Sequence, residues 1–379
     1  MRILHVFRAP LGGLFRHVLD VAHGQIARGH EVGIFCDSTT GGQRATEAFA
    51  ELGPRLQLGL HRVAMHRLPH WTDITALAAL NRLYRRAKPQ VLHAHGSKGG
   101  LYARAVTIPW QDRRTIRAYT PHGGSFNYRP GSGMHRAYMV AEKVLDVRTD
   151  LFLFESAYIK DRFDAYVGET RRLVRVVRNG IARSEFEPLD RVADPFDLIY
   201  LGELREAKGV DTLIDALSIL RRERDLRLTL LAVGSGPSED ELHRRTKDAG
   251  IWDTTTFAPP GPIRSALARG RVMVIPSKAE SLPYVILEAA AAAQPMVATN
   301  VGGIPEIFGD LADQLIPPAD PRILAEAILA KVSEPEEVRR AKAEAVSERI
   351  ATGFDIDQMV EQGIAGYRDA LAVRGINPV

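Results

Sequence analysis

The chain has 379 residues, of which 45% are hydrophobic and 25% charged, and these values are typical of a globular protein with two domains. The single cysteine, Cys36, excludes an internal disulfide framework and suits a reducing compartment. No apolar run approaches the roughly 18 residues that a membrane span needs, and the start MRILHVFRAP reads as a first strand rather than a signal peptide. We therefore expect a cytoplasmic protein.

The net charge of +4 hides an asymmetry between the two halves of the chain. Residues 1–190 carry 28 Lys and Arg against 17 Asp and Glu, a balance of +11, and the remainder carries 22 against 29, a balance of −7. A basic half next to an acidic half indicates that the first half meets something anionic, such as acidic lipid or a phosphate-bearing acceptor. An arginine-rich solvated surface is the alternative.

Short apolar, β-branched segments alternate with helix-like segments, a pattern typical of parallel sheets built by right-handed crossovers. The predicted strands are 2–7, 31–36, 91–95, 115–120, 151–155, 173–177, 197–204, 226–234, 272–277 and 295–300. The pattern stops at 184–196, where prolines and acids predict a linker. We therefore predict α/β domains at 1–187 and 197–355, a linker at 188–196, and a helix in 356–379 that packs back on a domain, with the N-terminal one as candidate.

Three polar segments follow predicted strands of the first half, at the strand ends where ligands of open α/β sheets bind. Gly12 and Gly13 allow a tight turn that turns backbone N–H groups toward an anion, although a plain turn uses the same residues. His93 and His95 share one sheet face, but no nearby Cys or acid completes a zinc site, so a structural or acceptor-lining role is favoured. His122 ends the next strand and either faces the cleft or lies in a surface turn.

The segment LGELREAKGVDTLIDAL opens the second half and places two cations between a strand and a helix. Arg205 and Lys208 lie in the short loop before a helix that begins near Gly209. Cations beside a helix start are suited to binding a diphosphate. Solvated surface charges are the alternative for this segment taken alone.

The segment ESLPYVILE places two carboxylates around apolar residues in a region that otherwise reads as core. Pro283 is tolerated in the first turn of a helix, so we predict a helix that starts near 281–283. Glu280 then lies in the loop before it, and Glu288 lies about one and a half turns into it. One ligand could place an anion at the helix start, one set of hydroxyls at Glu280 and another at Glu288. A nucleotide sugar has this layout, because its sugar, diphosphate and ribose are in series.

With these motifs in order, nearly the whole chain resembles the retaining glycosyltransferases of family four. The segments that carry the resemblance are GGLFRHVLDVAHGQIARGHEV, HAHGSKGGLYARA, TPHG, VRNGI, LGELREAKGVDTLIDAL, ESLPYVILEA and TNVGGIPEI. The resemblance implies two Rossmann-like domains with parallel sheets that face each other across a cleft, the GT-B fold. It also implies a UDP- or GDP-linked sugar as the donor substrate, no cofactor and no metal.

The resemblance further implies roles for the candidate residues. Glu288 would hold the ribose hydroxyls, and Glu280 would contact the donor sugar and stabilise positive charge near its anomeric carbon. Arg205 and Lys208 would neutralise the departing diphosphate, and His122 would reach the donor sugar from the first domain. The remaining donor-binding candidates are Gly12, Gly13, Ser281, Leu282, Pro283 and Tyr284. The candidates on the acceptor side are Arg16, His95 and Lys98.

Two departures from the family pattern concern the donor site. The family usually has Arg directly after the glycine that ends the strand, whereas Glu203 stands there, and Arg205 is the candidate replacement. The family also often has glycines inside the Glu-x7-Glu motif, where this chain has Ser281, Leu282 and Pro283. Pro283 has no N–H, so one potential phosphate donor is absent.

The function implied is transfer of a hexose from a nucleotide sugar, with retention of configuration, to a glycan or lipid-linked glycan of bacterial cell-surface polysaccharide synthesis. Contact with an anionic membrane at its inner face is expected from the basic half, and nucleic acid is not an expected partner. Alternatives are a nucleotide-sugar epimerase on the same architecture and a catalytically silent nucleotide-sugar-binding module. An NAD-dependent dehydrogenase is disfavoured because the dinucleotide glycine fingerprint is absent.

Overall fold

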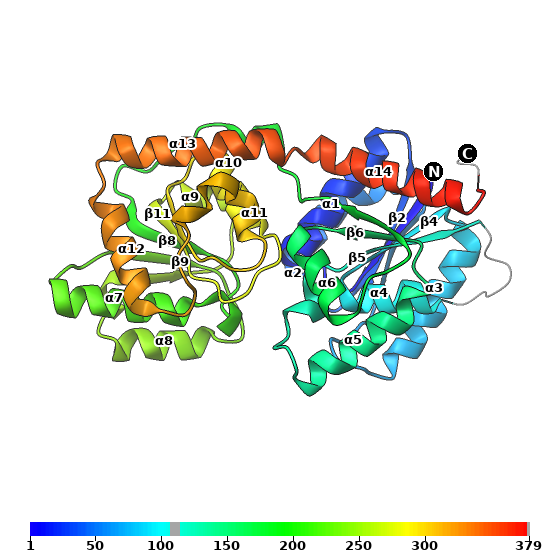
Figure 1. The fold of residues 1–379 in the computed structure, drawn as a ribbon, viewed down its shortest axis with the longest axis horizontal. Coiled ribbons are helices and arrows are strands. Elements are labelled where there is room, and N and C mark those ends of the chain that lie inside the picture. The colour runs from blue at the N-terminus through cyan, green and yellow to red at the C-terminus, as the bar shows by residue number, and fades with distance from the viewer. Residues whose placement is uncertain (107–113, 377–379) are drawn as a thin grey trace. The chain divides into compact units, whose positions relative to one another are not determined.

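The computed structural model describes residues 1–106 and 114–376, and the chain divides into two compact units (Figure 1). Unit 1 contains Met1–Gly180 and Ile356–Val379, and unit 2 contains Ile181–Asp355. The first unit therefore ends before the predicted linker at 188–196, which belongs to unit 2. Within the described residues, no helix has both the length and the apolar character needed to cross a membrane.

In the described residues, unit 1 is built on a parallel sheet of seven strands in the order β3-β2-β1-β4-β5-β6-β7. The strands are β1 Arg2–Phe7, β2 Glu31–Asp37, β3 Gly59–Val63, β4 Val91–His95, β5 Ile116–Thr120, β6 Leu151–Phe154 and β7 Leu173–Val176. Its helices are α1 Gly12–Ala27, α2 Gly42–Leu52, α3 Thr72–Ala87, α4 Gly96–Ala105, α5 Gly133–Asp146, α6 Ala157–Tyr166 and α14 Ile356–Val373.

Helices cover both faces of this sheet. The face that carries Leu4, Val6 and Leu92 packs against α3, α4, α5 and α6. On the opposite face, one cluster of strand residues packs against α1 and α2, and a second cluster packs against α1 and α14. Helix α14, at the end of the chain, therefore lies over the N-terminal sheet (Figure 1). Alternation along each strand sends His5, His93 and His95 toward this second face, under α1 and α14.

Unit 2 has a parallel five-stranded sheet in the order β10-β9-β8-β11-β12. The strands are β8 Phe196–Leu201, β9 Leu230–Val233, β10 Thr255–Ala258, β11 Gly270–Ile275 and β12 Met296–Ala298. Its helices are α7 Val210–Arg224, α8 Glu239–Asp248, α9 Ile263–Leu267, α10 Tyr284–Ala291, α11 Ile304–Phe308, α12 Pro321–Ser333 and α13 Glu336–Gly353. The expectation of two α/β domains with parallel sheets is confirmed.

Candidate functional site

The loops after β8 and β11 meet at one charged contact in unit 2. Lys208 Nζ lies 2.6 Å from Glu280 Oε1, and Ser277 Oγ donates a 2.7 Å hydrogen bond to the same oxygen. The side chain of Glu280 is only 8% exposed, so its charge requires these partners. An ammonium group has three N–H donors, which leaves Lys208 donors for a second anionic ligand.

Close backbone contacts hold these two loops together. Gly209 has a φ of +69°, and a Cβ there would lie 1.9 Å from the carbonyl oxygen of Pro276, so a larger residue is excluded. The Lys278 N–H donates a 2.9 Å hydrogen bond to the Ala207 carbonyl. The position of Lys208 against Glu280 is therefore fixed by the backbone on both sides of the pair.

A glycine pair after β12 supports the loop that carries Glu280. A Cβ on Gly302 would lie 2.0 Å from the Glu280 carbonyl oxygen, and one on Gly303 would lie 2.1 Å from that of Ser281. The Gly303 N–H donates a 2.7 Å hydrogen bond to the Ser281 carbonyl. These glycines belong to the segment TNVGGIPEI, but nothing in the local sequence indicates that they support Glu280.

Helix α10 begins at Tyr284 with Pro283 as its N-terminal cap residue, within one residue of the predicted start. Glu288 is the fifth residue of this helix and is 5% exposed. The side chains of Leu282 and Tyr284 are buried in the core of unit 2. The motif thus provides one acid in the loop and one inside the helix.

Arg205 pairs with the neighbouring acid that departs from the family pattern. Its Nε lies 2.9 Å from Glu203 Oε2, and both side chains are about half exposed. Arg205 is therefore close to the Lys208 loop, but its charge is partly neutralised by Glu203 in the described structure. Screening by water makes such a pair weak and easily rearranged.

Unit 1 brings five histidines together from β1, α1, β4 and the loop after β5. His95 is central: its Nε2 lies 2.9 Å from His5 Nδ1, and its Nδ1 lies 3.1 Å from His122 Nε2. The rings of His93 and His95 are 3.9 Å apart between centroids, as expected for residues on one face of a strand, and His17 of α1 packs edge-on against His122 at 4.7 Å. His122 is the partly exposed end of this cluster.

His122 has an unusual backbone as well as an unusual setting. Its φ is +53°, and Gly123 and Gly124 that follow also have positive φ. For a residue with a side chain this conformation is uncommon, and such strain is concentrated at functional sites. Burial lowers the pKa of His5 and His17 to about 4 and holds the pKa of His122 well below its usual value. The cluster is therefore neutral at physiological pH.

His5 and His17 of this cluster, and its hydrogen-bond partners Gln25 and Tyr367, were not predicted from the sequence. A histidine in the middle of the apolar strand RILHVF was the available signal for His5. Gln25 lies on α1 and Tyr367 on α14. The amide nitrogen of Gln25 is 3.2 Å from the Tyr367 hydroxyl, although 342 positions separate the two residues in sequence. No local pattern indicates that contact.

The other candidates of the first half lie around the same edge of the sheet. Gly12 begins α1 with a φ of +61°, and Gly13 follows it in the helix, as the tight-turn expectation requires. Arg16 lies 3.4 Å from Asp20 on α1, and Lys98 Nζ lies 2.8 Å from Asp73. His95, an acceptor-side candidate, is 1% exposed and does not reach the surface.

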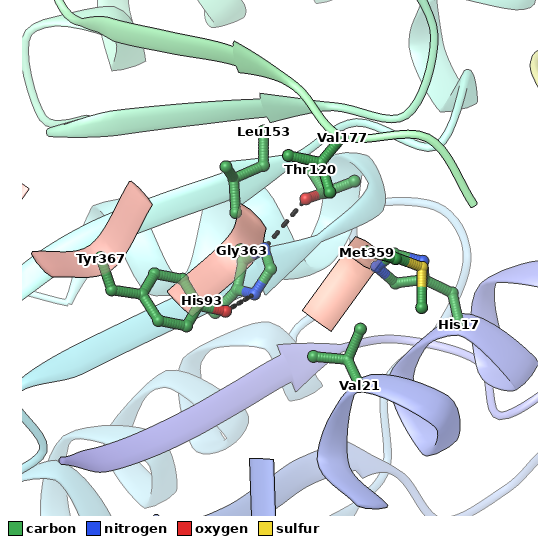
Figure 2. Close-up of a pocket in the computed structure, with 9 residues that line it drawn as sticks. All are labelled: His17, Val21, His93, Thr120, Leu153, Val177, Met359, Gly363 and Tyr367. Atoms are coloured by element: carbon green, nitrogen blue, oxygen red, sulfur yellow. Dashed lines mark hydrogen bonds between the residues drawn. The ribbon is translucent and has the colours of Figure 1, made fainter. Parts of the chain in front are cut away.

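A small pocket lies beneath the cluster, between the sheet and α14 (Figure 2). It is lined by His17, Val21, His93, Thr120, Leu153, Val177, Met359, Gly363 and Tyr367. The Tyr367 hydroxyl lies 2.7 Å from His93 Nδ1, and His93 Nε2 lies 2.9 Å from Thr120 Oγ1. The pocket is lined mostly by apolar surface, with polar groups already bonded to one another.

The histidine nitrogens are also close enough together for metal ligation. Those of His5, His93 and His95, and those of His17, His95 and His122, lie within 4.8 Å of one another. The expectation was that no nearby Cys or acid completes a zinc site, and the neighbours that the tertiary structure brings to His93 and His95 are further histidines. In the described structure several of these nitrogens are instead hydrogen-bonded to one another, and neither group contains a thiolate or a carboxylate.

Comparison with known proteins places these features in a family. A model described as "Glycosyltransferase Family 4" matches residues 11–185, and one described as "Glycosyl transferases group 1" matches residues 182–348. A glycogen synthase of Mycobacterium tuberculosis is 27% identical over 383 residues, covering 94% of this chain and 91% of that protein. A D-inositol 3-phosphate glycosyltransferase of Catenulispora acidiphila is 28% identical, covering 74% of this chain and 72% of its own length.

Solved structures show the same fold. Sucrose-phosphate synthase from Thermosynechococcus elongatus superposes with a TM-score of 0.79 at 20% identity, covering 98% of this chain and all of that one. Anabaena Alr3699/HepE in complex with UDP and glucose gives a TM-score of 0.79 at 18% identity, covering 97% of this chain and all of that one. The two parallel-sheet units thus have the GT-B architecture. With consecutive family models matched from residue 11 to residue 348, the chain belongs to the glycosyltransferases.

Proposed function

We propose that the protein transfers a hexose from a UDP- or GDP-linked sugar to a glycan or lipid-linked glycan, with retention of anomeric configuration and without a divalent metal. The observation that carries this proposal is the Lys208–Glu280 pair beside the start of α10, with Glu288 inside that helix. The complexes of Anabaena Alr3699/HepE with UDP and with UDP-glucose support a nucleotide sugar as the donor.

The proposed donor site assigns each acid a different part of the substrate. Glu288 would accept hydrogen bonds from the ribose hydroxyls, while Glu280 would face the sugar and stabilise positive charge that develops at its anomeric carbon. Lys208, the N–H groups at the start of α10 and, once released from Glu203, Arg205 would receive the diphosphate. These cations would perform the charge neutralisation for which other transferases use a metal.

The proposed contribution of unit 1 is His122, which would contact the donor sugar, with Gly12 and Gly13 offering close approach of the backbone. Arg16, Lys98 and, through His122, His95 would lie toward the acceptor. A positive φ and partial exposure at His122 support this assignment.

The activity is tested with a panel of UDP- and GDP-linked sugars, presented with glycan and lipid-linked acceptors and with EDTA. Release of the nucleoside diphosphate that depends on acceptor and persists in EDTA is the expected result. Retention is read from the anomeric coupling of the product. Isomerisation of the donor without acceptor would instead identify an epimerase, and binding without turnover would identify a silent module.

Exposed apolar side chains in two segments of unit 1, 68–74 and 134–147, support an acceptor at an anionic membrane. These side chains are Leu68, Trp71, Ile74, Met134, Val140, Val144 and Val147. Exposed basic residues of the same segments are Arg67, Arg136 and Lys143. Because α5 spaces Val140 and Val144 four residues apart, they share one helix face, and apolar residues flanked by cations are typical of contact with anionic lipid.

Vesicle flotation in low salt tests this part of the proposal separately. We expect the protein to float with vesicles that contain phosphatidylglycerol and not with neutral vesicles. The double variant Val140→Ser, Val144→Ser should remain in the soluble fraction. Wild-type protein that stays soluble with anionic vesicles would remove the membrane clause and leave the transferase proposal intact.

A further inference from the structure

A continuous chain of hydrogen bonds runs through the interior of unit 1 to His122. It begins at Tyr367, whose hydroxyl accepts from Gln25 Nε2 at 3.2 Å, and passes from Gln25 Oε1 to His5 Nε2 at 2.9 Å. It continues from His5 Nδ1 to His95 Nε2 at 2.9 Å and from His95 Nδ1 to His122 Nε2 at 3.1 Å. The first four members are at most 1% exposed, and His122 is the partly exposed end.

The amide of Gln25 gives this chain a direction. A neutral imidazole has one N–H donor and one acceptor nitrogen. In a ring that is hydrogen-bonded through both nitrogens, the role of one nitrogen therefore fixes the role of the other. Because Gln25 Oε1 accepts, His5 donates through Nε2 and accepts at Nδ1 from His95 Nε2–H. His95 then accepts at Nδ1 from His122 Nε2–H.

The consequence is a single protonation pattern at His122. Its proton lies on Nε2, and Nδ1 keeps its lone pair. Within the part of the chain that the structure describes, no hydrogen bond reaches that Nδ1. If the amide of Gln25 were reversed, every donor in the chain would reverse, and His122 would carry its proton on Nδ1 instead.

We propose that Gln25 and Tyr367 are positioning residues that fix His122 as the Nε2–H tautomer and keep its Nδ1 available as a hydrogen-bond acceptor. An unprotonated Nδ1 can accept a hydrogen bond from a substrate hydroxyl, but it disfavours a substrate group that can only accept hydrogen bonds. The tautomer of His122 therefore contributes to the selection of the nucleotide sugar. The effect on turnover rests on the proposed glycosyltransferase function, whereas the tautomer itself does not.

The surroundings of the chain support this assignment. Burial keeps the pKa of each ring low, so none of them becomes doubly protonated near neutral pH and the direction is preserved. Because the Tyr367 hydroxyl accepts from Gln25, its own proton is left for His93 Nδ1 at 2.7 Å, and this arrangement makes His93 Nε2–H the donor to Thr120 Oγ1 at the end of a second branch. Tyr367 therefore connects the two branches, and it enters from α14, at the far end of the sequence.

The direct test is NMR of protein labelled with 15N at histidine, with the His122 signals assigned by their loss in His122→Gln. At pH 7.5 we expect His122 as the Nε2–H tautomer, with the chemical shift of Nδ1 typical of an unprotonated nitrogen. In Gln25→Met, which keeps the length of the side chain but removes both hydrogen bonds, the His122 shifts should move toward a tautomer mixture. Tyr367→Phe should act in the same direction.

A matched control and a second measurement separate the relay from general damage. Tyr84→Phe removes another buried tyrosine hydroxyl, whose 2.8 Å bond goes to Thr115, and should leave the His122 shifts unchanged. Gln25→Met and Tyr367→Phe should lower kcat by about tenfold, the order of effect that follows loss of an outer hydrogen-bond partner, with little change in the donor KM.

Three results would overturn the relay. These are an Nδ1–H tautomer of His122 in the wild-type protein, unchanged His122 shifts in both variants, and stoichiometric metal in the purified protein that perturbs the histidine nitrogens. The first needs only the wild-type protein and His122→Gln for the assignment, and the third needs only the wild-type protein, so the proposal stays testable if Gln25→Met and Tyr367→Phe do not fold. Absence of transferase activity with every donor would refute the proposed function, while the tautomer measurement would still decide the relay.

Discussion

Lys208 and Glu280 are joined by a 2.6 Å ion pair although they lie 72 positions apart, one after β8 and the other after β11. Neither residue has a local partner of opposite charge that would place it there. The contact arises because neighbouring parallel strands deliver their following loops to the same edge of the sheet.

Breaking this pair should destabilise unit 2 and weaken donor binding. Lys208→Met leaves Glu280 nearly buried without its cation, which costs roughly 1–3 kcal/mol of unfolding free energy. Adding Glu280→Gln removes the unpaired charge, so the double variant should be more stable in urea than Lys208→Met alone. A double variant no more stable than Lys208→Met would contradict the pairing.

The two acids of the Glu-x7-Glu motif should have different kinetic effects. We expect Glu288→Ala to raise the donor dissociation constant strongly, because it removes contacts to the ribose. Glu280→Ala and His122→Ala should lower kcat more than donor affinity, because their contacts strengthen in the transition state. Calorimetry with the donor and steady-state kinetics distinguish these outcomes, and Glu337→Ala on the exposed face of α13 is the control. Full activity in both Glu280→Ala and His122→Ala would contradict the catalytic assignments.

Glu203 should restrain donor binding. Its Oε2 forms an ion pair with Arg205 Nε at 2.9 Å, and its carboxylate adds negative charge near the proposed diphosphate site. Glu203→Gln keeps the shape and removes the charge, so we expect donor KM to fall by about two- to fivefold, the effect of one screened surface charge. Arg205→Gln should have the opposite effect. A KM that rises in Glu203→Gln would show that the carboxylate itself assists the donor.

The pocket beneath the histidines offers a stabilising substitution. Gly363 lies in the middle of α14, and a Cβ there would have no heavy atom within 4 Å. Gly363→Ala should therefore raise the unfolding free energy by about 1 kcal/mol through helix propensity, without strain. Gly366 in the same helix is the comparison, because its Cβ would lie 3.1 Å from Leu151. Chemical denaturation of both variants measures the difference. If Gly363→Ala were the less stable of the two, the conclusion that the pocket has room for this methyl group would be contradicted.

Acid should destabilise unit 1 before its carboxylates titrate. Burial lowers the pKa of His5 and His17 to about 4, whereas the unfolded value is 6.5. The unfolded state therefore binds more protons between these values, and the stability present above pH 6.5 is lost as the pH falls toward 4. Each ring corresponds to on the order of 3 kcal/mol over the full window. Melting temperatures at pH 7.5 and 5.5 should differ less in His5→Gln than in the wild type, and an equal difference would contradict the assignment.

The alternation of strands and helices is visible in the sequence because it depends on neighbours along the chain. The buried central strands and the start of α10 were predicted, since apolar runs and a proline report them locally. The edge strands β3 and β10 were missed, whereas the other two edge strands, β7 and β12, were predicted. An edge strand is only partly buried, and the sequences GLHRV and TTFA lack a continuous apolar run.

The end of unit 1 was also decided by packing rather than by composition. Prolines and acids mark 184–196 as irregular, but Ile181 is already 1% exposed within the core of unit 2 and pairs with Asp355. Arg264 binds the carbonyl oxygens of Glu185 and Glu187, which holds this irregular segment against unit 2. A change in composition, such as the prolines and acids of 184–196, indicates where helices and strands stop. It does not indicate which hydrophobic core the irregular segment packs against.

The sequence alone determined the architecture, the loop that carries Glu280 and the position of His122 at a strand end. Only the tertiary structure decided that His5, Gln25 and Tyr367 stand behind His122 in one hydrogen-bonded chain. The physical reason is range: periodicity and turn residues act over a few positions, whereas the order of strands in the sheet and the return of α14 to unit 1 bring together side chains that are hundreds of positions apart.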